Sequence, residues 1–360
     1  MQKLLSRTFI VALFTFSLVS KILQGSEIEL VAKLPPETPP GNIAIGPEGR
    51  MFLSVHGFYN QPLKVVELLM DGSTKPYPTK KWAHAPEDGT IGLYGVLGLN
   101  VDPRGILWML DTASQEHAGR LIGWNTETEK LHRIIYLAKP VITENSFLND
   151  LAIDLKNNAI YIADTGAESI IVVDLTTGQA RRLLQGSIFT KAEEIDMVID
   201  GKLVEMNGKP ARLGINPITI DSENEYVYWG VMSGTAIYRI KADNLNDINL
   251  TDSALLARIE LYGEKPISDG ITVDDAGNVY ITSITDDSIG ITQPDGSYKT
   301  LFQIDTLSWP DGFAVGPDNY IYVTINELHR SPALNNGQNH SKGEFKVMRF
   351  KAISEAQPGR

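Results

Sequence analysis

A short pattern recurs six times along this chain, and it constrains the fold more than any other feature. In most copies a small, polar or flexible residue precedes an apolar stretch that ends in Asp or Gly. The six copies begin at Gly41, Leu97, Asn149, Asn216, Asp269 and Asp311. Most are followed by a turn and a second apolar stretch that contains an aromatic residue. A repeated unit of this kind is typical of an array in which no unit can bury its own apolar face.

The copies are 42 to 67 residues apart, which fits four antiparallel strands with their loops, as in the blades of a propeller. The sequence therefore predicts an all-β fold, a six-bladed β-propeller formed by residues 26–352, with a C-terminal tail at residues 353–360. We expect Ile28–Leu34 to pair with Phe345–Phe350. This pairing of the N-terminal and C-terminal strands would close the ring, because an open ring leaves unpaired strand edges.

Insertions interrupt the regular spacing. Residues 197–206 resemble a β-hairpin around an Asp-Gly pair, a sequence that favours a tight turn. Short helices are expected at Thr190–Asp196 and within Leu250–Ile259. Insertions in repeat folds tend to lie on one face, which is often the binding face.

The N-terminus is typical of an export signal. Lys3 and Arg7 precede an uncharged, mainly apolar run at Thr8–Val19, which is short for a membrane span. We expect residues 1–25 to be a signal peptide, with an uncleaved membrane anchor as the alternative. The mature protein would then be secreted or periplasmic, with no membrane contact after the signal is removed.

Composition excludes several kinds of site and partner. The chain has a formal net charge of −12, which repels phosphate backbones and anionic membranes, so nucleic acid is not an expected partner. It contains no cysteine, which excludes disulfides, thiolate metal sites and a cysteine nucleophile. The sequence leaves the oligomeric state open.

The repeat itself places candidate ligand-binding residues. In a propeller the innermost strand of each blade lines the central channel, so the residue just ahead of it lies at the channel mouth. Four of these residues carry side-chain oxygens, and they belong to four different blades: Asn149, Asn216, Asp269 and Asp311. We expect them to converge on a small-molecule ligand. The alternative is that they are turn formers, whose side chains bond neighbouring backbone amides.

A divalent cation is a further hypothesis for the same positions. Ca²⁺ and similar hard cations bind six to eight oxygens from carboxylates and amide carbonyls. Asn216 and Asp269 are the candidate metal ligands, with Asn149 as a further one. No cofactor is otherwise indicated.

Aromatic residues beside these positions are candidates for the walls of the site: Tyr94, Phe147 and Trp309. His329 is a further candidate, since it follows the second strand of the sixth repeat, although a lone histidine is more often a hydrogen-bonded structural residue. The acids at the far ends of the apolar stretches are expected to be turn residues instead: Asp102, Asp154, Asp221 and Asp274.

Several motifs resemble those of a known family. They are Phe147–Asp154, Tyr161–Gly166, Ile171–Leu175, Ser268–Asp274, Val279–Ser283, Trp309–Phe313 and Asn326–Pro332. Over about residues 28–350 the chain resembles the major royal jelly/yellow protein family, in particular its bacterial branch. The resemblance implies a secreted six-bladed propeller that binds an aromatic amine or a catechol-derived ligand at the channel end. It also implies a dopachrome-conversion type of isomerase activity as an open question.

A more distant resemblance is to the regucalcin/gluconolactonase propellers, which implies divalent-metal-dependent lactone hydrolysis as an alternative function. In that comparison Asn216 and Asp269 match metal ligands, and Asn149 matches a substrate-contacting residue. The glutamate expected in the first blade is Gly41 here, which removes both a charge and a ligand. A third alternative is a non-enzymatic scaffold that binds other proteins, since fold alone does not settle function.

Overall fold

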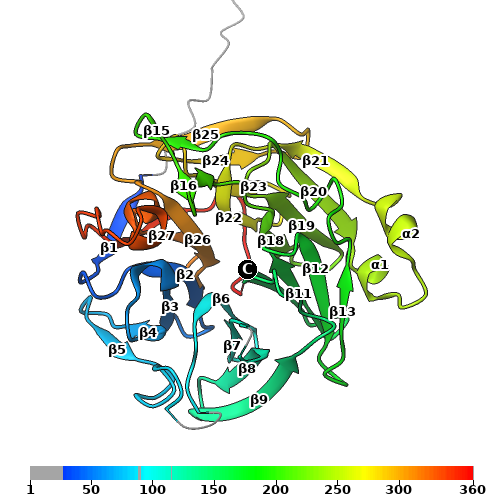
Figure 1. Ribbon diagram of the computed structural model, residues 1–360, viewed down its shortest axis with the longest axis horizontal. Coiled ribbons are helices and arrows are strands. Elements are labelled where there is room, and N and C mark those ends of the chain that lie inside the picture. Colours follow the sequence, from blue (N-terminus) through cyan, green and yellow to red (C-terminus); the bar gives the residue numbers. More distant parts are fainter. Residues whose placement is uncertain (1–26, 88–90, 115, 360) are drawn as a thin grey trace, which may run out of the picture.

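The computed structural model describes residues 27–87, 91–114 and 116–359. Six four-stranded antiparallel sheets stand around a common axis, and each forms one blade (Figure 1). This confirms the predicted six-bladed propeller. The signal peptide expected at residues 1–25 lies outside the described residues. Within the described part of the chain, no helix is long and apolar enough to cross a membrane.

The blades follow one another in chain order, and the first strand of each of the first five is the innermost. Blade one contains β2 (Pro40–Ile45), β3 (Met51–Val55), β4 (Val65–Leu68) and β5 (Thr74–Pro76). Blade two contains β6 (Val96–Val101), β7 (Ile106–Asp111), β8 (Gly119–Asn125) and β9 (Lys130–Leu137). Blade three contains β10 (Leu148–Asp154), β11 (Ala159–Asp164), β12 (Ser169–Asp174) and β13 (Ala180–Leu183).

The remaining blades have the same four-stranded form. Blade four contains β18 (Ile215–Ile220), β19 (Tyr226–Val231), β20 (Ala236–Lys241) and β21 (Glu260–Glu264). Blade five contains β22 (Ser268–Val273), β23 (Val279–Ser283), β24 (Ser288–Thr292) and β25 (Tyr298–Gln303). Blade six contains β26 (Pro310–Val315), β27 (Tyr320–Ile325), β28 (Lys346–Lys351) and, outermost, β1 (Glu29–Lys33).

The ring closes through the two ends of the chain. Strand β1 pairs antiparallel with β28, with Glu29 opposite Arg349 and Lys33 opposite Lys346. The Arg349 guanidinium also lies 3.0 Å from the Glu29 carboxylate. The predicted closure is therefore confirmed, and it leaves β28 without a free edge.

The acid at the end of an inner strand organises the turn that follows it. Asp274 accepts backbone N–H groups from Ala276 and Asn278, at 3.0 and 2.9 Å. It also accepts the Tyr280 hydroxyl, at 3.0 Å. Asp102 and Asp154 bond Trp108 and Tyr161 of the next strand in the same way. Asp221 accepts backbone N–H groups within its turn. The expectation that these acids are turn residues is confirmed, and in three of these turns the acid also holds the aromatic residue that follows.

The apolar core lies mainly between adjacent blades. One buried cluster joins blades two and three and includes Trp108, Leu121, Ile162 and Val173. Another joins blades three and four and includes Tyr161 and Trp229. Each blade therefore buries its faces against its neighbours, as the repeat predicted.

The insertion after blade three contains two short hairpins, β14 (Val198–Ile199) with β15 (Lys202–Leu203) and β16 (Glu205–Met206) with β17 (Lys209–Pro210). The first confirms the expected Asp-Gly hairpin. The short helices are α1 (Ala242–Asn246), which the sequence reading missed, and α2 (Asp252–Leu256), which lies inside the expected range.

The helix expected at Thr190–Asp196 is absent, so that prediction was wrong. The backbone groups there bond other segments instead of forming a helical ladder. The Thr190 carbonyl accepts from Ile215 N–H at 2.8 Å, and Glu193 N–H donates to the Ser233 carbonyl at 2.9 Å.

The segment after β28 runs along the turns of blades five and six toward the axis. Asp275 N–H donates to the Glu355 carbonyl, at 2.7 Å. Ala356 N–H donates to the side chain of Asn319, at 2.9 Å. Gly359 lies against the Val101 carbonyl of blade two, with φ of +86°, and Figure 1 places this end of the chain at the centre of the ring.

Candidate functional site

Every inner strand carries a β-bulge at the repeated sequence position. The pairing with the second strand shifts between Leu148 and Asp150, for example, and between Ser268 and Ile271. The corresponding shift occurs in all six blades. The repeated residues are thus the second residue of each strand, not residues ahead of it, which corrects the sequence-based placement. A bulge bends a strand and changes the direction of its side chains, so it can aim them into the channel.

The bulges of neighbouring blades touch one another near the axis. A Cβ added to Gly270 would lie 2.1 Å from the carbonyl oxygen of Asp311, and one added to Gly98 would lie 2.6 Å from that of Asn149. A Cβ on Gly312 would lie 2.1 Å from the Asn42 side chain. These glycines allow the blades to approach closely enough for side chains from different blades to meet.

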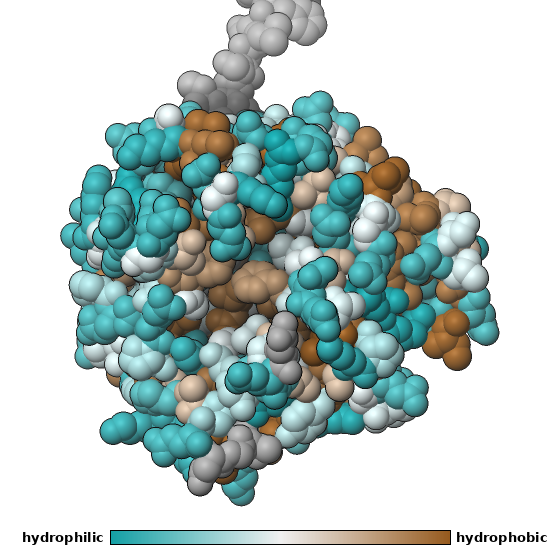
Figure 2. Space-filling model, viewed as in Figure 1, coloured by the Kyte–Doolittle hydropathy of each residue, from teal (hydrophilic) through white to brown (hydrophobic). Residues whose placement is uncertain are grey.

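The channel contains a cavity of about 300 Å³. All six repeated positions line it, and so do the predicted wall residues Phe147 and Trp309. Its other walls are largely apolar, and Gly359 lies at one end. Figure 2 shows the corresponding hollow, with apolar residues inside a mostly hydrophilic rim.

Two residues that were predicted to bind the ligand do not line the cavity. Tyr94 stacks on His117, with ring centroids 3.6 Å apart, and the Arg120 guanidinium lies 5.3 Å from its ring. His329 stacks behind Trp309, at 6.1 Å, and its Nε2 lies 3.3 Å from Asp200. His329 therefore contacts the cavity wall from outside.

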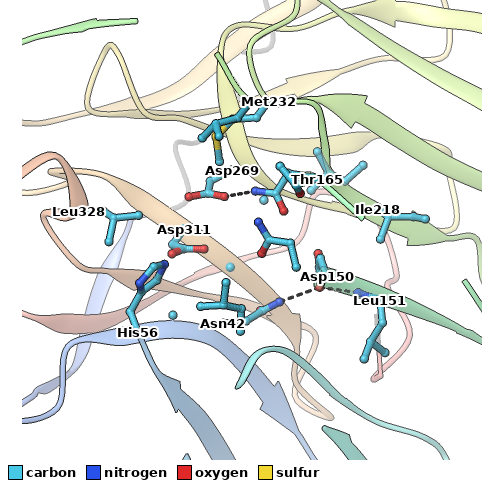
Figure 3. Close-up of a pocket in the computed structure, with 18 of the residues that line it drawn as sticks. Asn42, His56, Asp150, Leu151, Thr165, Ile218, Met232, Asp269, Asp311 and Leu328 are labelled. Carbon is cyan, nitrogen blue, oxygen red and sulfur yellow. Dashed lines mark hydrogen bonds between the residues drawn. The ribbon is translucent and has the colours of Figure 1, made fainter. Parts of the chain in front are cut away.

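Three carboxyl groups reach into the cavity from three blades, as Figure 3 shows for Asp150, Asp269 and Asp311. Both oxygens of Asp269 accept neutral donors, one from the Asn216 amide and the other from the Trp309 indole at 2.7 Å. Trp309 has a left-handed φ of +53°, a conformation that aromatic residues rarely adopt.

The other two carboxyls are also held by neutral groups. Asp311 accepts the Asn326 amide, at 2.6 Å. Asp150 accepts the Asn42 amide at 3.0 Å and the backbone N–H of Leu151 at 2.8 Å. Among the described residues that line the cavity, none is a lysine or an arginine.

This environment favours the protonated form of all three acids. Burial raises the pKa of Asp150 to about 7, and the nearby Asp269 charge contributes to the rise. Burial also raises the pKa of Asp269 to about 6, although its bonds from Trp309 and Asn216 oppose the shift. The pKa of Asp311 is raised well above its usual range by burial, and then by repulsion from Asp269 and Asp150.

A buried lysine stands behind the cavity wall. Lys265 Nζ donates to the carbonyls of Gly234 and Pro266, both at 2.9 Å. Burial lowers the pKa of Lys265 to about 7. Its positive charge acts on Asp269 and lowers the pKa of that carboxyl, which limits the rise caused by burial.

The sequence reading missed several polar residues of the cavity, among them Asn42, Asp150 and His56. Asn42 and Asp150 directly follow repeated positions, and strict strand alternation would turn them away from the channel. The bulges remove that alternation. His56 Nδ1 accepts the N–H of Phe58 at 3.2 Å, and burial lowers the pKa of His56 to about 3, so the ring is neutral.

The donors do not fit a bound metal as they stand. Within the described ranges, no three His, Cys, Asp or Glu side chains are placed to hold a metal ion. Both oxygens of Asp269 are already engaged by hydrogen-bond donors. The bonds to Asp269 would have to break before Asn149, Asn216 and Asp269 could hold a divalent cation.

Fold and site together define a six-bladed β-propeller with an acidic, largely apolar-walled cavity on its axis. Residues 94–355 match the family model of the major royal jelly proteins, so the chain belongs to this family. Among curated proteins, none matches the chain.

Solved structures of other propellers resemble it at low sequence identity. A streptogramin B lyase has a TM-score of 0.52 at 15% identity, over 91% of this chain and 98% of that one. A gluconolactonase from Xanthomonas campestris has a TM-score of 0.56 at 11% identity, over 91% and 89%. A calcium-binding protein, regucalcin, from Agrobacterium tumefaciens has a TM-score of 0.54 at 15% identity, over 93% and 98%. At these identities the likeness supports the shared fold alone.

Proposed function

We propose that this protein binds a small organic cation with an aromatic or apolar body in its central cavity. One observation carries the proposal: Asp150, Asp269 and Asp311 share a cavity whose described lining contains no lysine or arginine. Three acids in one enclosed space repel one another when ionised, so a ligand ammonium group that neutralises them is favoured. Hydrogen bonds from an ammonium group to carboxylates are also stronger than those between neutral groups.

The walls suit the rest of such a ligand. Phe58, Phe147 and Trp309 offer aromatic surfaces, and Met197, Met206 and Met232 add adaptable apolar ones. Aromatic faces attract cations, so they support the same choice of ligand. Asn149 and Asn216 supply further polar contacts. An aromatic amine or a catechol-derived amine combines these features, and it is also the class that the family resemblance implies.

The raised pKa values add a catalytic aspect to the proposal. A carboxyl with a pKa of about 7, such as Asp150, gives or accepts a proton readily at neutral pH. Proton transfer of this kind is what the tautomerisation of an oxidised catechol requires, so we propose isomerisation as the reaction to assay. No observation favours metal-dependent lactone hydrolysis: both oxygens of Asp269 accept hydrogen bonds, and within the described ranges no three His, Cys, Asp or Glu side chains are placed to hold a metal ion.

Calorimetry with matched ligands tests the proposal. We expect tyramine, dopamine and tryptamine to bind, and their neutral alcohol analogues and simple lactones to bind at least about tenfold more weakly, because only the amines supply a charged donor. Asp269→Asn should weaken amine binding by about tenfold or more, whereas the exposed Asp295→Asn serves as a control. Equal affinity for an amine and its alcohol would contradict the proposal, and binding of neither would favour a protein-binding scaffold.

The cellular location of the protein is proposed from its sequence alone. Residues 1–25 lie outside the described part of the chain, so the proposal that the protein is secreted or periplasmic rests on the basic start and the apolar run at Thr8–Val19. Expression of the full chain with a C-terminal tag, followed by fractionation and N-terminal sequencing, tests export and locates any cleavage.

A further inference from the structure

The insertion between blades three and four forms part of the cavity. We call residues 197–213 the strap. Its apolar side chains line the cavity together with the three aspartates: Met197, Val204, Met206, Ala211 and Leu213. The strap leaves blade three and reaches blade six on the other side of the ring, where β16 contacts the short helix Pro332–Leu334. Figure 1 shows β15 beside β25 and β16 between β24 and β27. It is therefore one wall of the cavity entrance.

A charged contact ties the tip of the strap to blade six. Asp200, in the turn of the first hairpin, accepts from the Arg330 guanidinium at 2.7 Å and lies 3.3 Å from His329 Nε2. Arg330 also donates to Glu327, at 2.6 Å, and that buried carboxylate accepts the N–H of Lys342 at 2.8 Å. Since His329 stacks on Trp309, this contact connects the strap tip to the cavity wall. We call the Asp200–Arg330 pair the latch.

The strap is fastened at its base and has little regular structure between base and tip. Arg212 pairs with Asp196 at 2.9 Å and with Glu194, which ties the end of the strap to the residues just before its start. Each of its four strands has only two residues. Short strands favour local opening, but this opening must expose the buried side chains of Met197, Ile199, Val204 and Ala211. The methionine side chains that the strap presents to the cavity are flexible, so their contacts can break and form again easily.

We propose that the strap is a movable wall of the cavity, held against blade six by the latch, and that release of the latch sets the rates of ligand entry and exit. The proposal adds regulation to the site described under the proposed function. The gating role rests on the proposed function, because it requires the amine ligand. The movement of the strap can be tested without any ligand.

The first experiment needs no ligand. Lys202 is exposed within the strap, so trypsin cleavage after Lys202, followed by mass spectrometry, reports strap opening. Asp200→Asn removes the latch charge and suits the left-handed φ of +53° at this position. We expect cleavage about fivefold faster, the factor for one partly exposed ion pair. Asp295→Asn, the same exchange in another Asp-Gly turn, should leave the rate unchanged. Arg330 is kept, because its loss would leave buried Glu327 unpaired.

The second experiment measures gating by stopped flow with tryptamine. We expect kon and koff to rise together, about fivefold, in Asp200→Asn, with Kd within about twofold of the unaltered protein. Cleavage after Lys202 at the unaltered rate would overturn the movable strap. Faster cleavage with unchanged kon and koff would overturn its gating role. If the unaltered protein binds no amine, the proposed function fails, and the cleavage rate still decides whether the strap moves.

Discussion

At the scale of single residues, the cavity holds its acids with neutral donors. Asp269 is bonded by an amide and an indole, and Asp311 by an amide. Neutral donors fix the positions of these carboxyls without neutralising their charge, which leaves the charge available to a ligand. The same arrangement makes both binding and stability depend on pH.

Amine binding should strengthen as pH rises from 5 to 8. The pKa of Asp269 is raised to about 6 and that of Asp150 to about 7, so these groups lose their protons, and gain the charge that attracts a cation, within this interval. We expect at least about a tenfold gain in affinity, levelling off near pH 8, measured by calorimetry. The neutral alcohol analogue is the control, and an amine affinity that is flat across this range would contradict the assignment of these carboxyls.

Asp311→Asn should stabilise the fold at high pH. Burial raises the folded-state pKa of Asp311 above its unfolded value, so the folded state binds the proton more tightly. Stability therefore falls as pH rises through the interval between the two values. The Asn oxygen still accepts the Asn326 amide but carries no charge. We expect the free energy of unfolding to rise by about 1–2 kcal/mol at pH 8, with the gain shrinking toward pH 4.

Chemical denaturation of both proteins at pH 4 and pH 8 measures this difference. A loss of stability at pH 8 would show that the Asp311 charge has a stabilising partner in the unliganded protein.

At the scale of elements, the β-bulge decides the site. Each inner strand is bulged at the same position, and the bulges pack against one another through Gly98, Gly270 and Gly312. A regular strand would present one of two consecutive side chains to the channel. Because of the bulge at Asn149, both Asn149 and Asp150 line the cavity.

Gly270→Ala should disrupt both the fold and the site. The new methyl group would lie 2.1 Å from the Asp311 carbonyl oxygen, so blades five and six would have to separate locally. We expect a loss of about 3 kcal/mol in the free energy of unfolding, measured by denaturant titration, together with weaker amine binding. Gly57→Ala is the matched control, because a Cβ there meets no atom within 4 Å. Similar stability of the two variants would refute the close packing of the bulges.

At the scale of the whole molecule, the ring depends on one pairing between distant parts of the sequence. Strand β1 completes blade six beside β28, so the two ends of the chain hold the ring shut. The C-terminal segment then reaches the axis, where Gly359 lines one end of the cavity.

Removal of residues 1–33 should open this closure. The outer edge of β28 would lose its partner, and unpaired edges promote association of chains. We expect a lower melting temperature and a shift to larger species in size-exclusion chromatography. A variant that lacks only residues 1–26 retains β1 and should remain unchanged in both measurements. A normal melting temperature and elution volume without β1 would show that closure does not depend on this strand.

Much of the site could be predicted because the repeat fixes equivalent positions. Asn149, Asn216, Asp269 and Asp311 were identified from the repeat alone, and the structure places all four in one cavity. Asn42 and Asp150 were not, since nothing in the local sequence distinguishes a bulged strand from a regular one. Tyr94 and His329 were expected in the site but do not line the cavity. Both adjoin a predicted strand, yet each stacks on another ring outside the lining.

The sequence by itself determined the number of blades, the strand that closes the ring and the acids that end the inner strands, because each depends on apolar periodicity or on local turn chemistry. Only the tertiary structure decided which polar side chains meet, how far their pKa values shift and where the strap is latched. These features depend on contacts between residues far apart in the chain, such as Asp200 with Arg330 and Asn42 with Asp150. Burial and the close approach of different blades create those contacts, and no single segment of the sequence determines either of them.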